Sequence, residues 1–204
     1  MIAIIDYGVG NLFSLSCSLK HIGYEAVITG DAGTIKRCDK MLLPGVGAFA
    51  DAANMLRRTG LDKIVIKEAR QGKPLLGVCL GMQMLFEKSF EFGEHDGLGL
   101  LQGVVVPIRP RIPENCKVPH IGWNALKFPK GADSPIFKYS NDGDHVYFVH
   151  SFHAEQCLDT VTATTEYGAE LTAAVGRGNI FGTQFHPEKS GEAGLNILRA
   201  YAGL

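Results

Sequence analysis

Short apolar runs alternate with stretches of helical hydrophobic spacing along the first part of the chain. Such runs predict buried strands, and apolar positions three and four residues apart predict amphipathic helices. We expect strands at 2–5, 26–29, 40–43 and 75–79, and helices at 12–21, 49–58, 61–70 and 80–87. Strands that alternate with helices are joined by right-handed crossovers, which indicates a mostly parallel, doubly wound sheet flanked by helices.

The pattern changes after the helix expected at 80–87. An acidic loop at 89–97 is followed by strand-like segments separated by proline-rich turns and by one final helix. We expect these strands at 104–106, 118–121, 125–128, 145–151, 161–165, 171–175 and 180–185, and the helix at 192–201. The tight turn at 176–179 predicts a hairpin, so the C-terminal half is expected to add an antiparallel β extension. Without an internal repeat or a linker, residues 1–204 are expected to form a single domain.

Composition and charge exclude several classes of function. The 204 residues are 46% hydrophobic and 20% charged, with a formal net charge of -1, which gives no electrostatic reason to invoke nucleic acid or an anionic membrane. The five cysteines are widely spaced and odd in number, so we expect a reducing, cytoplasmic location rather than a disulfide framework or a zinc site. We expect neither a signal peptide nor a membrane span, because no basic leader or long apolar run is present.

The first chemical candidate is Cys79, which lies between the strand expected at 75–79 and the helix expected after it. Gly77 and Gly81 complete the pattern Gly-x-nucleophile-x-Gly. Such a sharp strand-to-helix turn exposes its central residue at a sheet edge and at a helix N-terminus, where a thiolate is favoured. The alternative is a buried structural cysteine, and this stretch alone leaves both open.

A second candidate stretch surrounds His186. His186 and Glu188 flank Pro187 at the end of an expected strand, and in extended chain positions i and i+2 point the same way. We therefore expect one imidazole and one carboxylate to be presented together. Placed beside Cys79, they would supply a base for the thiol and a group that orients this base.

A cysteine that attacks a carboxamide needs donors for the oxyanion. The N–H of Leu80, the residue after the nucleophile, is one expected donor. The turn at 44–47, Pro-Gly-Val-Gly, can present a second N–H from Val46 or Gly47. An ordinary strand-to-helix loop is the alternative for this turn.

Two other groupings are set aside. Gly8 and Gly10 suggest a dinucleotide fingerprint, but Phe13 occupies the third glycine position. The second grouping is a polar cluster of Asp142, Asp144, His145, His150 and His153. Its members lack the helical spacing of metal ligands, so we expect them to be solvated or hydrogen-bonded. We therefore predict no metal and no cofactor.

Three motifs together carry a resemblance to a known family. Gly-Val-Cys-Leu-Gly-Met-Gln at 77–83, Pro-Gly-Val-Gly-Ala-Phe at 44–49 and Gln-Phe-His-Pro-Glu-Lys-Ser at 184–190 resemble the triad-type, class I glutamine amidotransferases. The stretches 6–11, 119–124 and 148–151 are further similar to the glutaminase subunits of imidazole glycerol phosphate synthase. The resemblance runs from Met1 to the final helix.

The resemblance implies a role for each triad residue. Cys79 would attack the side-chain amide of L-glutamine and form a γ-glutamyl thioester. His186 would protonate the departing ammonia and then activate water, and Glu188 would orient His186.

The same resemblance implies a set of substrate-binding residues. Gln83 and Glu91 match positions that hold the α-amino and α-carboxylate ends of glutamine, although Glu91 also suits a solvated acidic loop. Gly47 and the backbone around Ser151 and Phe152 would complete the pocket. Many relatives have tyrosine where this chain has Phe152, so any role of that hydroxyl is absent.

A partner is implied as well. Free ammonia in water at neutral pH is mostly ammonium, so such glutaminases pass it directly to a (βα)8-barrel cyclase, here one that makes imidazole glycerol phosphate in histidine biosynthesis. Trp123 and Asn124 would lie in that interface, Asn11 on the same face, and Lys189 would pair with an acidic residue of the barrel.

Alternative functions remain at this point. A paralogous amidotransferase that serves a nucleotide or surface-sugar pathway shares almost all these motifs. A catalytically idle binding subunit, or a cysteine hydrolase of another amide, belongs to a different class. The intact set of Cys79, His186 and Glu188 argues against an idle subunit.

Overall fold

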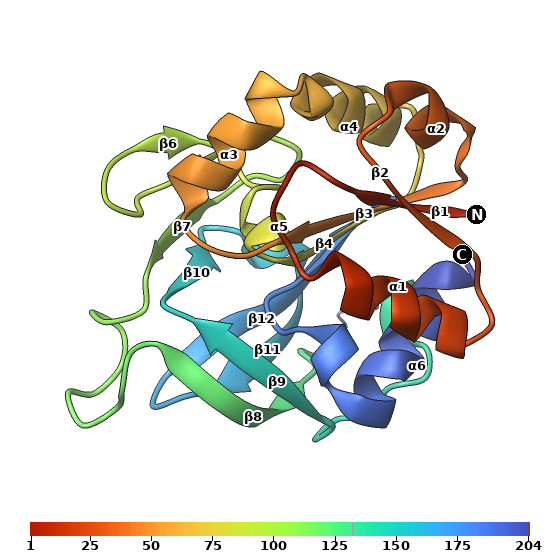
Figure 1. Cartoon of the computed structure of the whole chain (residues 1–204). Helices are drawn as coiled ribbons and strands as arrows, with labels where there is room; N and C mark the ends of the chain where they lie inside the picture. Colours follow the sequence, from red (N-terminus) through yellow and green to blue (C-terminus); the bar gives the residue numbers. More distant parts are fainter. Residues whose placement is uncertain (132) are drawn as a thin grey trace.

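A computed structural model describes residues 1–131 and 133–204, and its centre is a nine-stranded sheet in the order β2-β1-β3-β4-β13-β12-β11-β8-β9 (Figure 1). Its strands are β1 (Ile2–Ile5), β2 (Ala26–Thr29), β3 (Lys40–Gly45), β4 (Leu75–Cys79), β8 (His120–Lys127), β9 (His145–His150), β11 (Val161–Glu166), β12 (Glu170–Arg177) and β13 (Ile180–Thr183). The first five strands in this order pair in parallel, and the remaining pairs are antiparallel. The predicted fold class, a doubly wound sheet with an antiparallel extension, is confirmed.

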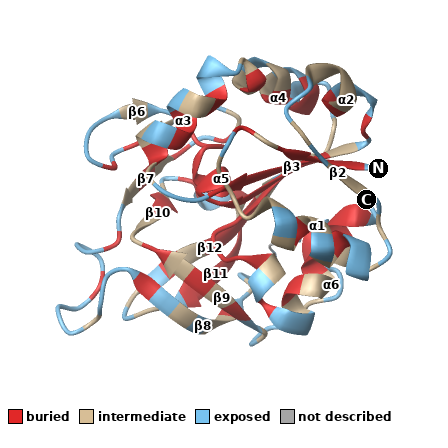
Figure 2. Cartoon of the chain, in the orientation of Figure 1, coloured by how far each residue is buried: buried red, intermediate tan, exposed pale blue. Residues whose placement is uncertain are grey.

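Helices cover both faces of the parallel half. On one side lie α2 (Ala32–Arg37), α3 (Phe49–Arg58) and α4 (Leu61–Arg70), and on the other lie α1 (Leu12–His21) and α6 (Gly191–Ala202) (Figure 1). A separate apolar core fills each side, and the central strands are buried on both faces, as continuous apolar runs require (Figure 2). No helix in the described part of the chain is long and apolar enough to cross a membrane.

The antiparallel half differs in part from the prediction. The hairpin between β12 and β13 is confirmed, with Arg177 paired to Ile180. The two strands expected at 118–121 and 125–128 are instead one continuous strand, β8, which pairs with β9 over residues 120–125 and with β11 at its end. The prediction split it because Gly122 and Asn124 look like turn residues, but cross-strand pairing overrides that local preference.

A second, four-stranded sheet was not predicted. It has the order β10-β7-β5-β6, with β5 (Lys88–Ser89), β6 (His95–Asp96), β7 (Val104–Pro107) and β10 (Phe152–Glu155). The short α2 and the three 3-10 turns at Pro135–Phe137, Leu158–Thr160 and Pro187–Lys189 were also missed. Elements of two to six residues contain too little periodicity for a pattern to be recognised.

The helix expected at 80–87 is one turn long, α5 (Leu80–Gln83). The carbonyls of Met84 and Leu85 accept the N–H groups of Leu98 and Leu100 at 2.8 and 2.9 Å, from the returning loop. That loop takes the acceptors that a longer helix would use, so the helix ends. The macrodipole argument for Cys79 therefore weakens, because one turn sums few peptide dipoles.

Gly81 permits α5 to pack directly on β3. A Cβ at Gly81 would lie 1.9 Å from the carbonyl oxygen of Leu43, and one at Gly77 would lie 2.6 Å from the carbonyl oxygen of Gly81. Because the backbones of β3, β4 and α5 meet without intervening side chains, the turn that carries Cys79 has a fixed place at the sheet edge.

Replacement of Gly81 by alanine should therefore destabilise the chain. The new methyl group would collide with main chain that has no room to move, and we expect a loss of roughly 1–3 kcal/mol in the free energy of unfolding. Gly33→Ala in α2 is the matched control, since its Cβ would meet only flexible side-chain atoms of Asp31 and Arg37. Denaturant unfolding of both variants checks this, and equal stabilities would contradict the packing argument.

Candidate active site

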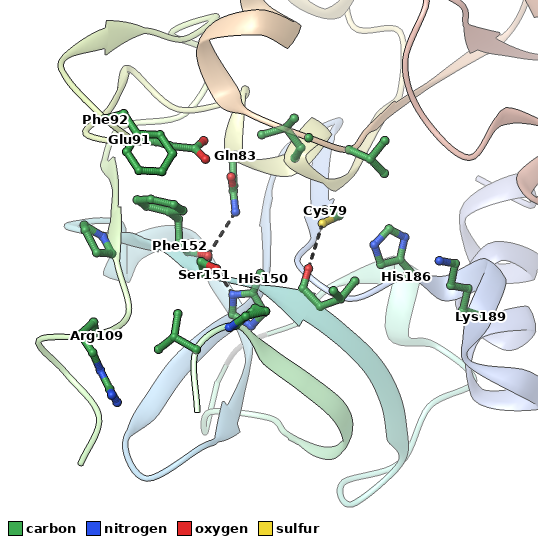
Figure 3. Close-up of a pocket in the computed structure, with 17 residues that line it drawn as sticks. Cys79, Gln83, Glu91, Phe92, Arg109, His150, Ser151, Phe152, His186 and Lys189 are labelled. Atoms are coloured by element: carbon green, nitrogen blue, oxygen red, sulfur yellow. Dashed lines mark hydrogen bonds between the residues drawn. The ribbon is translucent and has the colours of Figure 1, made fainter. Parts of the chain in front are cut away.

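A pocket of about 700 Å³ opens at the carboxyl edge of the parallel strands (Figure 3). β3, β4 and β13 are neighbours that run in parallel, so their carboxyl ends Gly45, Cys79 and Thr183 lie at one edge. Ten of the residues singled out from the sequence line this pocket: Val46, Gly47, Cys79, Leu80, Gln83, Glu91, Ser151, Phe152, His186 and Lys189. The position matches the rule that open α/β sheets bind ligands at the carboxyl ends of their strands.

Cys79 occupies a strained turn, as the Gly-x-Cys-x-Gly pattern predicted. Its φ of 55° and ψ of -113° place a side-chain-bearing residue in a region that normally favours glycine. The side chain nevertheless lines the pocket with 7% of the residue exposed. Such strain persists only when surrounding packing fixes it, and it aims the sulfur into the pocket rather than into the core.

His186 and Glu188 lie together, although the geometry differs from the prediction. Imidazole Nδ1 and carboxylate Oε1 are 2.9 Å apart, and both side chains are almost fully buried. The extended-chain argument was wrong: β13 ends at Thr183, and Glu188 sits in the 3-10 turn Pro187–Lys189. Proline is favoured at the first position of such a turn, so it ends the extended segment and turns Glu188 back onto the ring.

Two further residues fix this pair. Asn11 donates its side-chain N–H to the same Glu188 oxygen at 3.1 Å, which ties α1 to the site. Ser190 donates its hydroxyl to the carbonyl of His186 at 2.6 Å and accepts the N–H of Tyr147. The position of the imidazole is thus set by hydrogen bonds from three separate segments of the chain.

The ring of His186 lies next to Cys79 in the pocket (Figure 3). Burial lowers the pKa of His186, but hydrogen bonds to Cys79 and Glu188, together with their negative charges, outweigh burial and raise it to about 9. A raised pKa means that the imidazolium is favoured when it faces a thiolate and a carboxylate. The arrangement is therefore suited to hold a proton between sulfur and ring.

Sequence reasoning missed Gln184, which is fully buried beside the sulfur. Its Nε2 lies 3.7 Å from Sγ of Cys79, and its Oε1 accepts a hydrogen bond of 3.1 Å from Gln83. The sulfur also lies 3.9 Å from the carbonyl of Val149. Gln184 belongs to the motif at 184–190, but only the pairing of β13 with β4 shows that it reaches Cys79.

The turn at 44–47 lies next to the sulfur of Cys79. The start of this turn, at Pro44, is held in place. Tyr7 is buried and donates its hydroxyl to the carbonyl of Pro44 at 2.7 Å, and burial together with the charge of Cys79 raises the pKa of Tyr7. Beyond that point the turn is open: Val46 is 42% exposed, and Gly47 has a φ of +90° with open space around it. The predicted oxyanion donors of this turn thus lie on its loosely packed part.

Gln83 and Phe152 lie at the other end of the pocket. Nε2 of Gln83 donates to the carbonyl of Phe152 and to Gln184, each at 3.1 Å, so both of its N–H bonds are used inside the protein. The carbonyl oxygen of Gln83 remains as the atom available to a ligand. Such an acceptor suits an ammonium group.

Glu91 is held by the start of α3. The backbone N–H of Phe49 donates to its Oε2 at 2.7 Å. Burial raises the pKa of Glu91, against the effect of that N–H. The carboxylate lines the pocket, so the alternative of a solvated acidic loop does not describe this residue.

Of the residues predicted for a partner interface, Lys189 lines the pocket, and Lys189 and Trp123 both lie beside Tyr147. Trp123 is 53% exposed and its ring centroid lies 6.0 Å from that of Tyr147. Nζ of Lys189 lies 5.9 Å from the centroid of the same Tyr147 ring. Asn124, on β8, is only half-buried but its side chain is bonded within the protein.

Members of the polar cluster considered for a metal make hydrogen bonds within the protein. His153 lies 3.0 Å from Glu155, and His150 bonds to His120 and to the carbonyl of Phe152. Asp142 and Asp144 accept backbone N–H groups. Within residues 1–131 and 133–204, no group of three or more His, Cys, Asp or Glu side chains is arranged to hold a metal ion.

Removal of the sulfur should lower the pKa of His186. In Cys79→Ala the hydrogen bond and the charge that raise this pKa are lost while burial still lowers it, so the ring should release its proton below pH 9. NMR titration of the histidine ring nitrogens in variant and wild type checks this. Cys17→Ala, which removes an exposed cysteine, should leave the titration unchanged, and an unaltered midpoint in Cys79→Ala would contradict the pairing.

Comparison with known proteins assigns the chain to a family. The model of the family "Glutamine amidotransferase class-I" matches residues 3–201. The subunit HisH of imidazole glycerol phosphate synthase from Caldanaerobacter subterraneus subsp. tengcongensis is 50% identical, covering 98% of this chain and 97% of the relative. The HisH of Lactococcus lactis is 47% identical, covering 98% of this chain and 96% of the relative.

Solved structures agree at the level of the fold. A glutamine amidotransferase superposes with a TM-score of 0.76 at 19% identity, covering 100% of this chain and 99% of the other. PurLQS from Thermotoga maritima gives 0.75 at 22% identity, covering 99% and 97%. The chain belongs to the class I glutamine amidotransferases, within the group of HisH subunits of imidazole glycerol phosphate synthase.

Proposed function

We propose that Cys79, His186 and Glu188 hydrolyse glutamine, and that the ammonia passes to a (βα)8-barrel cyclase for imidazole glycerol phosphate synthesis. The observation that carries this proposal is the meeting of the three side chains at the carboxyl edge of β4 and β13. The relatives are named as subunits of imidazole glycerol phosphate synthase, which supports the assignment to histidine biosynthesis.

The first half of the reaction forms a thioester. The thiolate of Cys79 attacks the side-chain carbonyl carbon of glutamine, and the electron pair of the C=O bond moves to oxygen. The N–H of Leu80 and an N–H from the 44–47 turn stabilise this oxyanion. When the tetrahedral intermediate collapses, the C–N bond breaks and His186 donates its proton to the nitrogen, which leaves as ammonia.

The second half regenerates the enzyme. The now neutral His186 takes a proton from water, whose oxygen attacks the thioester carbon. The C–S bond then breaks, glutamate is released, and the proton returns to the pair of sulfur and ring. Glu188 keeps the ring oriented through both steps by its bond to Nδ1.

The exposed face around the pocket suits a partner that receives ammonia. Tyr147 lies between Trp123 and Lys189, and Lys189 lines the pocket, so an aromatic and cationic group of side chains adjoins it. Aromatic residues are enriched in interface hot spots, and Lys189 can pair with an acidic residue of the cyclase. L-Glutamine is the small-molecule substrate, and a cytoplasmic location follows from the biosynthetic role.

Loss of the nucleophile should separate the two half-reactions. In the complex with the cyclase, Cys79→Ala should abolish glutamine-dependent product formation, because no thioester can form, while activity with added ammonium salts should remain. Steady-state assays with each nitrogen source check this, with Cys17→Ala as control. Loss of the ammonium-dependent reaction as well would contradict the division of labour between the subunits.

Docking of the cyclase should activate the glutaminase. Because Val46 and Gly47 are loosely packed in the free chain, their N–H groups are expected to reach the oxyanion position only when a partner covers the turn. A gained oxyanion donor typically raises kcat by about 10²–10³. Rates of glutamine hydrolysis with and without the cyclase measure this activation. Full activity of the chain alone would contradict the prediction.

A further inference from the structure

A buried pair of histidines lies between the exposed strand β8 and the glutamine pocket. His120 on β8 and His150 on β9 are paired across the two strands. His120 is fully buried and His150 is 5% exposed. Nδ1 of His120 lies 3.0 Å from Nε2 of His150, and His120 is also stacked on Tyr167 with centroids 3.9 Å apart. Among the described residues no hydrogen bond joins either ring to Cys79; His150 lines the pocket, but the reaction as described gives neither ring a role.

The two ends of this pair contact hydrogen-bond acceptors. Nε2 of His120 lies 2.8 Å from Oδ1 of Asn124, and Nδ1 of His150 lies 2.8 Å from the carbonyl oxygen of Phe152. The amide of Asn124 is held in this orientation because its Nδ2 donates to the carbonyl of Glu166 at 2.9 Å. An amide oxygen at one end and a carbonyl oxygen at the other both require an N–H from the rings.

Counting protons shows that these contacts conflict. We call each of the three contacts a junction, and together they need three N–H groups. The junctions join Asn124 to His120, His120 to His150, and His150 to Phe152. Two neutral imidazoles carry only two. A third proton would satisfy every junction, but it would leave a positive charge in the interior.

The protein environment disfavours that charge. Burial lowers the pKa of His120, and burial together with the neighbouring His120, His153 and His186 lowers the pKa of His150 to about 3. The pair is therefore neutral at pH 7, and one of the three junctions lacks its proton as long as the Asn124 oxygen faces His120.

Two arrangements keep a hydrogen bond between the rings and resolve the conflict. In the first, the oxygen of Asn124 faces His120, both rings carry their proton on Nε2, and the carbonyl of Phe152 loses its N–H from His150. In the second, the Asn124 amide turns by 180°, both rings carry their proton on Nδ1, and Phe152 is held while the carbonyl of Glu166 loses its donor. Each arrangement gives up one hydrogen bond, so neither has a large advantage.

We propose that His120 and His150 are positioning residues that form a two-state pair, coupling the amide orientation of Asn124 on β8 to the backbone carbonyl of Phe152 in the pocket. The effect on glutamine binding rests on the proposed function. Phe152 O also accepts Nε2 of Gln83, so the state of the pair sets how firmly the pocket backbone is held. Glu166 is exposed, so a donor that binds its carbonyl from outside replaces the bond lost when the Asn124 amide turns and favours the second arrangement.

The tautomers of the rings provide a direct test in the whole chain. Asn124→Leu removes the amide, so only Phe152 directs the pair, and Nε2 of His120 should lose its proton while Nδ1 of His150 carries one. Asn124→Asp presents only acceptors, so Nε2 of His120 should carry a proton. NMR of ¹⁵N-labelled histidines reads these positions independently of any activity. Identical ring-nitrogen shifts in both variants and wild type would overturn the proposal.

The link to the pocket is tested by glutamine binding in a Cys79→Ala background, where no turnover occurs. His150→Phe keeps a ring of similar shape but removes the N–H to Phe152, and should raise the Kd for glutamine by about 3- to 10-fold, as expected for one neutral hydrogen bond. Asn124→Leu, which favours the bond to Phe152, should not raise it. Thermal unfolding confirms that both variants are folded.

The outcomes separate this proposal from the function it rests on. If both variants raise the Kd equally, the pair is only structural and the proposal is wrong. If glutamine does not bind to the parent Cys79→Ala chain at all, the proposed function fails, whereas the tautomer shifts still decide whether the pair has two states.

Discussion

The parallel pairing of β4 with β13 is the constraint on which the site depends. Val78 is paired with Thr183, so Cys79 and the segment that leads to His186 leave the sheet at the same edge. The two side chains come from residues more than a hundred positions apart, and only this register brings them together. A slip of one residue would turn each side chain of the strand to the opposite face, and sulfur and ring would then be separated by the sheet.

Burial strengthens the electrostatic interaction between Glu188 and His186. The Glu188 carboxylate is fully buried, and its contact with His186 is therefore little screened by water. This burial lowers the stability of the fold, because Oε2 of Glu188 has no hydrogen-bond partner among the described residues. The backbone of Cys79 is also strained, at a φ of 55°. Local strain and an unsatisfied oxygen are typical of a site that is held by its surroundings for chemistry rather than for stability.

The sequence predicted those features that depend on local pattern. The parallel strands, their helices and the elbow at Cys79 each follow from apolar runs and glycine positions. The 3-10 turn at Glu188 could not be foreseen, because proline fits both an extended segment and the first position of a turn. Gln184 and the histidine pair were missed for another reason: their partners lie across strand pairings whose register no local pattern reveals. The roles assigned to individual site residues remain predictions.

The two ends of the pocket differ in how firmly the fold holds them. Hydrogen bonds from separate segments fix His186 and Glu188, and backbone packing at Gly81 fixes the turn of Cys79. The 44–47 turn is anchored at Pro44 by Tyr7 and at Gly45 by the pairing of β3 with β4, and it is open at Val46 and Gly47. The nucleophile and the ring beside it are thus firmly held, whereas Val46 and Gly47, the oxyanion donors predicted on the 44–47 turn, are loosely packed. Val46 and Gly47 line the same pocket as Lys189, and Lys189 lies beside Tyr147, so the proposed cyclase, if docked on this surface, would cover the open turn while it is in place to receive the ammonia.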